Sequence, residues 1–546
     1  MNDFVSHPRA RELARLASMM SLAAALAACS NSESAASPPP PAPPALAPKA
    51  TLSTPSDGQF AWHVAQPALV TLTDTRGVAV ASSATTCVAH DATQATVRAD
   101  CGEITALRVG GLVIDVSGGG VTASLLVQGV PQRQWTGVHG ASRYAALTVG
   151  ADGNGAAWGD NANGVLSQGV GPSTLASLAV ATPMLGIAGL PYAGVAQTTL
   201  AEQSAAVLLT DGSAQAWGED NFHELGATVT TNSTFTPVAV VDLTARASLQ
   251  HVVQLEIGKE NGVALIDDGK VVSWGGWPGN GTASSSSLPV ETLAPSGAAP
   301  LSHVAAVSAG WNYSLALTED GHVLSWGFEP GNGVLGTGSV INGVAQLPAS
   351  VVRSDGTALD NIVQISAGYD FALALAADGT VWAWGDNAFG QLGRAAIGGS
   401  SAVAVQVQGL AGGSLGRIAM VAAGGNHALA LDLDGRVLAW GYAPDGSLGD
   451  GATKPVVNQT SVPRTVVNEA GSSSGFTDIV SVAAGYANSY ALGRDGRVLS
   501  WGSNFHGALG RMTSASSDNT PGLVTSAGGK MSLTPAGYPN LLRHAR

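Results

Sequence analysis

The chain has 546 residues, of which only 11% are charged and 71 are glycine, and its formal net charge is −14. This length allows more than one domain, and the composition is typical of many short strands and tight turns rather than long charged helices. The acidic balance argues against a nucleic-acid partner, because binding to phosphates requires a cationic surface.

The first 28 residues have the pattern of a secretory signal. An apolar run of small residues occupies positions 16–28, and it is too short for a membrane span. Three basic residues precede this run, as such signals require: Arg9, Arg11 and Arg15. We therefore expect residues 1–28 to be removed from the folded protein.

The end of the signal resembles the bacterial lipobox, since it reads Leu26-Ala27-Ala28-Cys29. The resemblance implies cleavage before Cys29, lipid attachment to its sulfur and anchoring at the bacterial envelope. Ser30 follows the cysteine, and by the same resemblance this favours the outer membrane, with the protein facing the periplasm or the exterior. An ordinary signal peptide with a cysteine near its end is the alternative.

Two further segments precede the repeats. Residues 29–50 are rich in Pro, Ala and Ser and predict an extended tether. Residues 51–131 contain short alternating runs separated by Gly and Asp, which predict a small all-β domain, such as an immunoglobulin-like sandwich. Two cysteines remain in this domain, Cys87 and Cys101, and in an oxidising compartment we expect them to form a disulfide.

The rest of the chain repeats one phrase seven times: Asp-Gly, four residues, then Trp-Gly. The phrase recurs every 52 to 61 residues, which is the signature of a repeat architecture. Its tryptophans are Trp158, Trp217, Trp274, Trp326, Trp384, Trp440 and Trp501.

The best-kept copies, residues 365–393, 420–441 and 482–502, resemble the regulator of chromosome condensation (RCC) repeat family. That family's unit is a Gly-x-x-His/Asn-Ser-x-Ala-Leu strand, an Asp-Gly turn, a Val-x-x-Trp-Gly strand and a closing Leu-Gly. The resemblance implies a seven-bladed β-propeller over residues 132–546. We therefore expect an all-β protein in which this propeller follows the small sandwich-like domain.

The repeated tryptophans have a structural interpretation. The strand that carries each of them is uncharged on both faces, which predicts cover on both sides by neighbouring blades. The third copy departs from the pattern, because a Gly/Ser-rich stretch replaces its closing Leu-Gly after Trp277. His427 occupies the family's His position, and we interpret it as a residue that hydrogen-bonds its own turn.

The sequence contains no catalytic motif, metal-ligand spacing or cofactor loop that we recognise. We therefore expect neither an enzyme nor a metal, and no cofactor. If the strands of each blade are lettered A to D, the A–B and C–D loops lie at one end of the propeller, opposite the Asp-Gly turns. We call this end the binding rim.

Aromatic and acidic side chains on the binding rim are the candidates for contact with a protein or glycan. For the residues directly after Trp-Gly, capping of a turn is the alternative, and the aromatic residues could instead pack within the rim. The candidates are Trp277, Trp311, Tyr369, Asp370, Asp386, Phe389, Tyr442, Tyr486 and Phe505.

The sequence thus favours an exported, lipid-anchored propeller that acts as a monomeric binding scaffold for a protein or glycan. Two other functions remain as alternatives. Guanine-nucleotide exchange is the activity of the family's namesake, but an export signal argues against a cytosolic substrate. The second alternative is an enzyme that acts on envelope glycans.

Overall fold

The structure is a computed structural model, and all statements about it concern the residues that it describes. The predicted signal, Cys29 and the tether up to residue 48 lie outside them. The described residues are 49–53, 59–61, 65–67, 69–73, 79–81, 85–90, 95–101, 103–106, 110–130, 138–139, 144–150, 153–242, 247–409, 412–451, 459–526 and 529–530.

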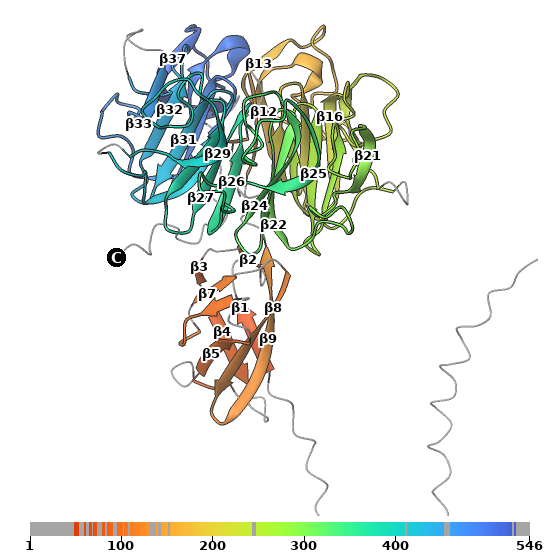
Figure 1. Cartoon of the computed structure of the whole chain (residues 1–546), viewed down its shortest axis with the longest axis vertical. Helices are drawn as coiled ribbons and strands as arrows, with labels where there is room; N and C mark the ends of the chain where they lie inside the picture. The colour runs from red at the N-terminus through yellow and green to blue at the C-terminus, as the bar shows by residue number, and fades with distance from the viewer. Residues whose placement is uncertain are drawn as a thin grey trace, which may run out of the picture. The chain divides into compact units, whose positions relative to one another are not determined.

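The region before the repeats consists of three small sheets (Figure 1). One pairs β1 (Lys49–Ser53) with β4 (Leu69–Thr73), and a second has the order β3 (Ala65–Pro67), β7 (Glu103–Ala106), β6 (Ala95–Val97). The third has the order β2 (Gln59–Ala61), β9 (Val121–Val130), β8 (Gly110–Gly118), β5 (Thr85–Ala89), with β2 parallel to β9. Leu72, Ile104, Ile114 and Val116 form their shared core.

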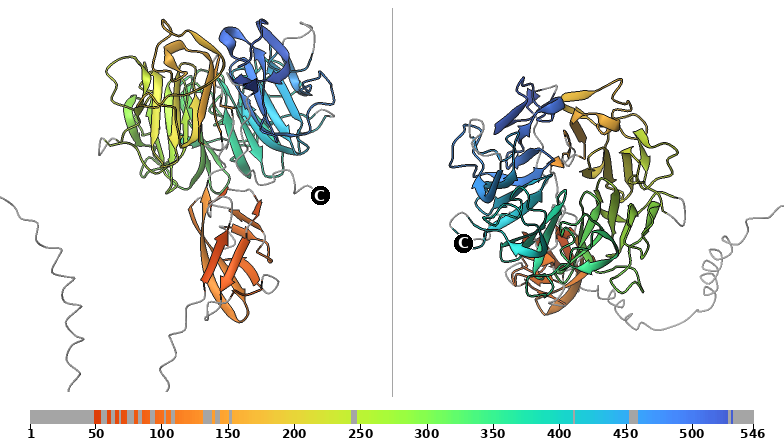
Figure 2. Two further views of the ribbon diagram at one scale, coloured as in Figure 1. Left: turned by 180° about the vertical axis from the view of Figure 1, so that it is seen from behind. Right: turned by 45° about the horizontal axis from the view of Figure 1, so that its top comes forward.

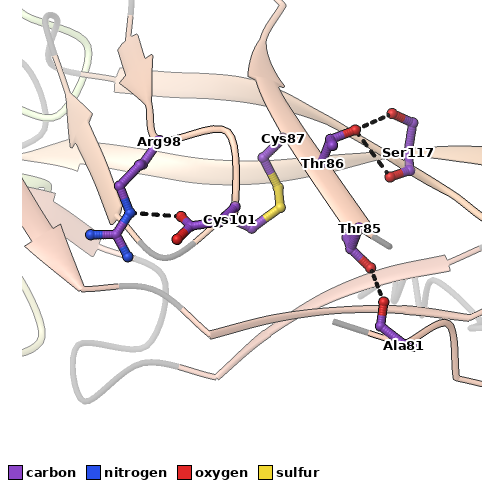
Figure 3. The surroundings of a disulfide bond; sticks show 8 residues. Ala81, Thr85, Thr86, Cys87, Arg98, Cys101 and Ser117 are labelled. Carbon is purple, nitrogen blue, oxygen red and sulfur yellow. Dashed lines mark hydrogen bonds and ion pairs between the residues drawn. A yellow bond between two sulfur atoms is a disulfide. The ribbon is translucent and has the colours of Figure 1, made fainter. Parts of the chain in front are cut away.

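The two cysteines of this region lie in that core, and the structure joins them as a disulfide (Figure 3). Cys87 lies in β5 and donates its N–H to the carbonyl of Ala99, at 3.1 Å. Cys101 has a φ of 60°, and its N–H bonds the carbonyl of Arg98 at 2.8 Å. This tight turn brings the two Cα atoms to 5.0 Å.

The repeats form a seven-bladed β-propeller, in which the sheets surround a central axis (Figure 2, right). Blades 1 to 3 cover the first part of the ring. Blade 1 has β10 (Val138–His139), β11 (Ala145–Val149), β12 (Gly155–Asp160) and β13 (Ser177–Pro183). Blade 2 has β14 (Val195–Leu200), β15 (Ser204–Leu209), β16 (Ala214–Glu219) and β17 (Ser233–Ala239). Blade 3 has β18 (Val252–Ile257), β19 (Asn261–Ile266), β20 (Val271–Gly275) and β21 (Ser286–Glu291).

Blades 4 to 7 complete the ring in chain order. Blade 4 has β22 (Val304–Ala309), β23 (Tyr313–Thr318), β24 (Val323–Glu329) and β25 (Gly343–Ser350). Blade 5 has β26 (Ile362–Ala367), β27 (Phe371–Ala376), β28 (Val381–Gly385) and β29 (Ser401–Gln406). Blade 6 has β30 (Ile418–Ala423), β31 (His427–Asp432), β32 (Val437–Tyr442) and β33 (Gln459–Thr465). Blade 7 has β34 (Ile479–Ala484), β35 (Asn488–Gly493), β36 (Val498–Ser503) and β37 (Ser517–Leu523).

The backbone geometry requires the glycine after each repeated tryptophan, and blade 5 illustrates the reason. The pairing of β28 with β29 shifts register between Ala383 and Gly385, so the strand carries a β-bulge at Trp384. Gly385 has a φ of +98°, and a Cβ there would lie 2.5 Å from the carbonyl oxygen of Asp370. Only glycine therefore fits the bulge where the third strand passes the A–B loop.

The tryptophans themselves join neighbouring blades, and all seven side chains are fully buried. In six seams the indole N–H donates to a backbone carbonyl of the preceding blade, just before its closing Leu, at 2.8–3.0 Å. The acceptors are Ala508 for Trp158, Val165 for Trp217, Glu224 for Trp274, Val334 for Trp384, Gln391 for Trp440 and Ser447 for Trp501.

The seam between blades 3 and 4 differs from the other six. Blade 3 lacks the closing Leu-Gly, and the indole N–H of Trp326 finds no hydrogen-bond partner among the described residues. Gly279, with a φ of +70°, still packs against this indole in place of the usual closing glycine. The departure of the third copy therefore removes the hydrogen bond and keeps the packing.

Glutamines on the inner strands add a second set of contacts between blades. Gln197 in β14 both donates to the carbonyl of Leu255 and accepts its N–H, at 2.8 and 3.1 Å. Gln254 and Gln364 bridge to Val307 and Val421 of the next blade in the same way. Each amide side chain thus replaces a backbone pair between strands that do not form a common sheet.

The seam between blades 7 and 1, where the ring closes, contains the same tryptophan hydrogen bond. Ala508 accepts hydrogen bonds from Trp158 and from the Tyr490 hydroxyl, at 3.0 and 2.9 Å. A short C-terminal hairpin, β38 (Thr525–Ser526) and β39 (Gly529–Lys530), adds a parallel bridge from Ser526 to Ala181 in β13. Two short 3-10 turns, η2 (Ala162–Gly164) and η3 (Phe505–Gly507), lie in the C–D loops of blades 1 and 7.

His427 does not bond its own turn, so that interpretation was wrong. It begins β31, it is fully buried, and its Nε2 lies 2.8 Å from the Ser489 hydroxyl of blade 7. Burial lowers the pKa of His427 to about 4, so the ring is neutral at pH 7. The histidine is a contact between blades because its side chain points across the seam.

Candidate functional site

The binding rim holds all nine candidate residues. Antiparallel strands place the A–B and C–D loops at one end of each blade and the Asp-Gly turns at the other. Four candidates lie in A–B loops, near the axis: Trp311, Tyr369, Asp370 and Tyr486. Five lie in or at the start of C–D loops: Trp277, Asp386, Phe389, Tyr442 and Phe505.

Three of the candidates meet in what we call the central aromatic cluster: Trp311, Tyr369 and Tyr486. The rings of Trp311 and Tyr369 are perpendicular, at 86°, and the centroids of Tyr369 and Tyr486 are 5.7 Å apart. Blade 6 contributes Gly425 instead of an aromatic residue, and a Cβ there would lie 2.8 Å from Cδ2 of Tyr486. All three rings are half-buried, so each packs against its neighbours and still presents an edge to solvent.

The other aromatic candidates form separate pairs, each of which joins two neighbouring blades. Trp277 stacks on Phe328 with ring centroids 5.2 Å apart, and the ring centroids of Phe389 and Tyr442 are 4.2 Å apart. Phe505, which is 52% exposed, lies 4.7 Å from Tyr144. The candidates are therefore distributed around the rim and do not form a single patch.

The two residues after Trp-Gly have different roles in most blades. In five of the seven blades the second residue is turned inward, where its side-chain oxygen accepts the backbone N–H of the closing Leu at 3.1–3.2 Å. The first residue stays half-exposed in most blades. The inward residues are Asn161, Asp220, Glu329, Asn387 and Asn504, and the half-exposed ones are Asp160, Glu219, Phe328, Asp386 and Tyr442.

The residue at the second position therefore caps the loop, as the alternative stated, whereas the residue at the first position presents its side chain to solvent. Asp386 also bonds within its loop, because it accepts the N–H of Ala388 and an N–H of Gln391. The sequence could not separate the two positions, since in blades 1, 2 and 5 both carry Asp, Asn or Glu.

Carboxyl groups on the two ends of the propeller have opposite electrostatic environments. At the Asp-Gly turns, hydrogen bonds from the residue after the glycine, Ser213 or Thr380, lower the pKa of Asp211 and of Asp378. On the binding rim, burial and then the nearby Asp386 raise the pKa of Asp370 to about 6. Burial also raises the pKa of Glu224 to about 7, with Asp220 and Glu219 adding to the shift. Perturbed carboxyls of this kind cluster at functional surfaces.

A second acidic group on the rim was missed by sequence reasoning. Nζ of Lys259, in the A–B loop of blade 3, lies 3.4 Å from a carboxylate oxygen of Glu202 and 4.2 Å from the ring centroid of Trp311. The same ammonium interacts electrostatically with Glu219 and Glu260. These glutamates come from different loops, so no local motif in the sequence could have indicated that they lie together.

Within the described part of the chain, His, Cys, Asp and Glu side chains form no group of three that could hold a metal ion. No helix in the same residues combines the length and the hydropathy that a membrane crossing requires.

Comparisons with known proteins identify the repeats. A family model described as the RCC1-like domain matches residues 276–534. The chain is 30% identical over 300 residues to the mitochondrial RCC1 domain-containing protein RUG3 of Arabidopsis thaliana, covering 54% of this chain and 62% of RUG3. It is 33% identical over 244 residues to the Arabidopsis ultraviolet-B receptor UVR8, covering 44% of this chain and 50% of the receptor. The chain thus spans less than two thirds of each of these relatives, and only 25% of human HERC6.

Solved structures show the same fold. Human WBSCR16 matches with a TM-score of 0.55 and 22% identity, over 68% of this chain and 95% of that one. Yeast RCC1 (Prp20), solved bound to Kap60, matches with a TM-score of 0.56 and 20% identity, over 72% of this chain and 86% of that one.

Proposed function

Because this chain belongs to the RCC repeat family and carries its propeller, we propose that it is a protein-binding scaffold that uses the central aromatic cluster. The cluster is the observation that carries the proposal. Three half-exposed rings from three blades meet beside the axis, and such rigid aromatic groups dominate the energetics of protein interfaces.

Two further observations support a binding role. The blade frame is regular, whereas the half-exposed position after Trp-Gly carries Asp, Glu, Phe or Tyr in different blades. In addition, a solved propeller of this fold, yeast RCC1, is bound to another protein, Kap60. A constant frame with a variable rim is the arrangement that presents side chains to a partner.

Photo-crosslinking from the rim tests this proposal. Benzoylphenylalanine at Phe389 should capture a partner in extracts of the source cells, and the partner is then purified for a direct binding assay. The triple substitution W311A/Y369A/Y486A should weaken its binding at least about 100-fold, because each anchor contributes on the order of 1–2 kcal/mol. I187A/L190A is the matched control, since it removes two exposed apolar side chains from a loop at the Asp-Gly end. Unchanged binding by the aromatic triple variant would contradict the proposal.

We also propose that the protein is exported and lipid-anchored through Cys29 at the cell envelope. The apolar run and the lipobox-like sequence support this, and the Cys87–Cys101 pair fits an oxidising compartment. Metabolic labelling with radioactive palmitate should mark the wild-type chain, whereas the C29A variant should stay unlabelled. Equal labelling of both chains, or of neither, would contradict the anchor.

A further inference from the structure

Resting on the proposed binding function, we propose that the partner docks through a lysine- or arginine-rich segment, with one cationic side chain seated on Trp311 among Glu202, Glu219 and Glu260. We call these four residues the cation seat. The inference names the chemistry of the partner, which the proposed function leaves open.

A cation of the chain itself already occupies this seat. Nζ of Lys259 lies 4.2 Å from the Trp311 ring centroid and 3.4 Å from a carboxylate oxygen of Glu202. An aromatic face beside carboxylates is the environment that binds ammonium and guanidinium groups. Lys259 thus acts as an internal stand-in for the side chain of a partner.

One ammonium does not balance the charge of the seat. Lys259 interacts with Glu202, Glu219 and Glu260, so the seat keeps an excess of negative charge. Next to the seat, Glu224 is fully buried, and its Oε1 has no hydrogen-bond partner among the described residues. A cationic segment would neutralise this excess, and the net charge of −14 would attract it from a distance.

The cation seat is continuous with the central aromatic cluster, because Trp311 belongs to both sites. The A–B loops of blades 3 and 4 are joined directly by a hydrogen bond from the N–H of Glu260 to the carbonyl of Trp311, at 3.1 Å. A segment that lies across the cluster would therefore reach the cation seat without further rearrangement.

The test measures the anisotropy of fluorescein-labelled hexalysine and hexaglutamate with the purified propeller-containing chain. Hexalysine should bind, and binding should weaken as salt is raised, whereas hexaglutamate should not bind. E202Q/E219Q/E260Q should weaken hexalysine binding by about 10-fold or more. D267N/D268N/D320N is the matched control, because it removes three exposed carboxylates from the Asp-Gly end, and it should bind as the wild type does.

Substitution of Lys259 should strengthen hexalysine binding, whereas substitution of the glutamates should weaken it. K259M should bind hexalysine about 3- to 10-fold more tightly, because it vacates the Trp311 face and removes a competing charge. Weaker binding by K259M, equal losses in the two triple variants, or hexaglutamate binding that depends on Lys259 would overturn the inference.

Failure of the inference and failure of the proposed function give different results. If W311A/Y369A/Y486A loses the captured partner but the glutamine variants keep it, only the cationic chemistry is wrong. If the aromatic variant keeps the partner, the proposed function itself fails.

Discussion

At the scale of single residues, equivalent tryptophans in different blades differ in their hydrogen bonding. Seven tryptophans are equally buried, yet Trp326 lacks the carbonyl partner that the other six have. A buried N–H without a partner costs about 1–3 kcal/mol of stability. The sequence predicted the burial, because the pattern of small and large residues repeats. It showed that the third copy lacks the closing Leu-Gly, but not that the residue before this leucine supplies the indole acceptor, because the acceptor in the intact seam of Trp384 lies 50 residues earlier in the chain.

The comparison of W326F with W384F tests this difference. Both substitutions remove part of a buried ring, but only W384F breaks a hydrogen bond and leaves the Val334 carbonyl without its donor. W384F should therefore lower the free energy of unfolding by about 1–2 kcal/mol more than W326F does. Chemical denaturation followed by tryptophan fluorescence measures both values. Equal losses would show that the unpaired N–H has no cost.

The contribution of Glu224 to the stability of the fold depends on pH. Its folded-state pKa of about 7 lies above the usual value of 4.5, so the folded state binds the proton more tightly than the unfolded state does. The stability that this proton provides is fully present below pH 4.5 and is lost as the pH rises through 7. Gln391 occupies the equivalent position in blade 5, where its Nε2 donates to Asp386 and its Oε1 accepts the N–H of Phe389.

We therefore expect E224Q to be more stable than the wild type at pH 8, by about 1–3 kcal/mol, and nearly equal to it at pH 4.5. Denaturation midpoints at the two pH values measure the effect. A variant that is destabilised by the same amount at both would contradict the raised pKa.

At the scale of elements, five of the C–D loops are each held by one capping side chain. Asn387 donates to the carbonyls of Ala396 and Gly398 and accepts the N–H of Leu392. The neighbouring Asp386 bonds only within the tip of the loop. The sequence offered capping after Trp-Gly as an alternative, but it could not show which of two adjacent polar residues turns inward. That choice depends on the backbone path at the β-bulge, where the register shifts.

The adjacent pair N387A and D386A separates these two roles. N387A should lower the free energy of unfolding by about 2–4 kcal/mol, because three buried hydrogen bonds lose their partner. D386A should change it by less than about 1 kcal/mol. Thermal unfolding followed by circular dichroism reports both. A larger loss for D386A would reverse the assignment of cap and presented residue.

At the scale of the whole molecule, the repeats made the propeller predictable. The contacts that close the ring between blades 7 and 1 could not be predicted. Seven copies imply seven blades, as the sheets have. The small domain before them was predicted as an all-β, immunoglobulin-like sandwich without a strand order, because its parallel β2–β9 pair and its three-sheet arrangement have no periodic signature. The lipid anchor, the partner and the environment of the protein remain predictions.

Two truncations test how the ring closes. A chain that ends at Thr525 loses β39 and the bridge to Ala181 but keeps the Trp158–Ala508 contact, so its melting temperature should fall by less than about 4 °C. A chain that ends at Ser514 loses β37 and the buried Val524, so it should fail to unfold as one cooperative unit. Differential scanning calorimetry distinguishes these outcomes. Loss of cooperativity in the longer chain would mean that the β38–β39 hairpin is required to close the ring.

In most blades one of the two residues after Trp-Gly secures the loop from within, and the other is half-exposed. We expect the half-exposed residue to be exchangeable without a change in the blade frame, which makes this ring a template for engineered receptors. A combinatorial library that varies Asp160, Glu219, Phe328, Asp386 and Tyr442 together would sample many recognition surfaces on one unchanged scaffold.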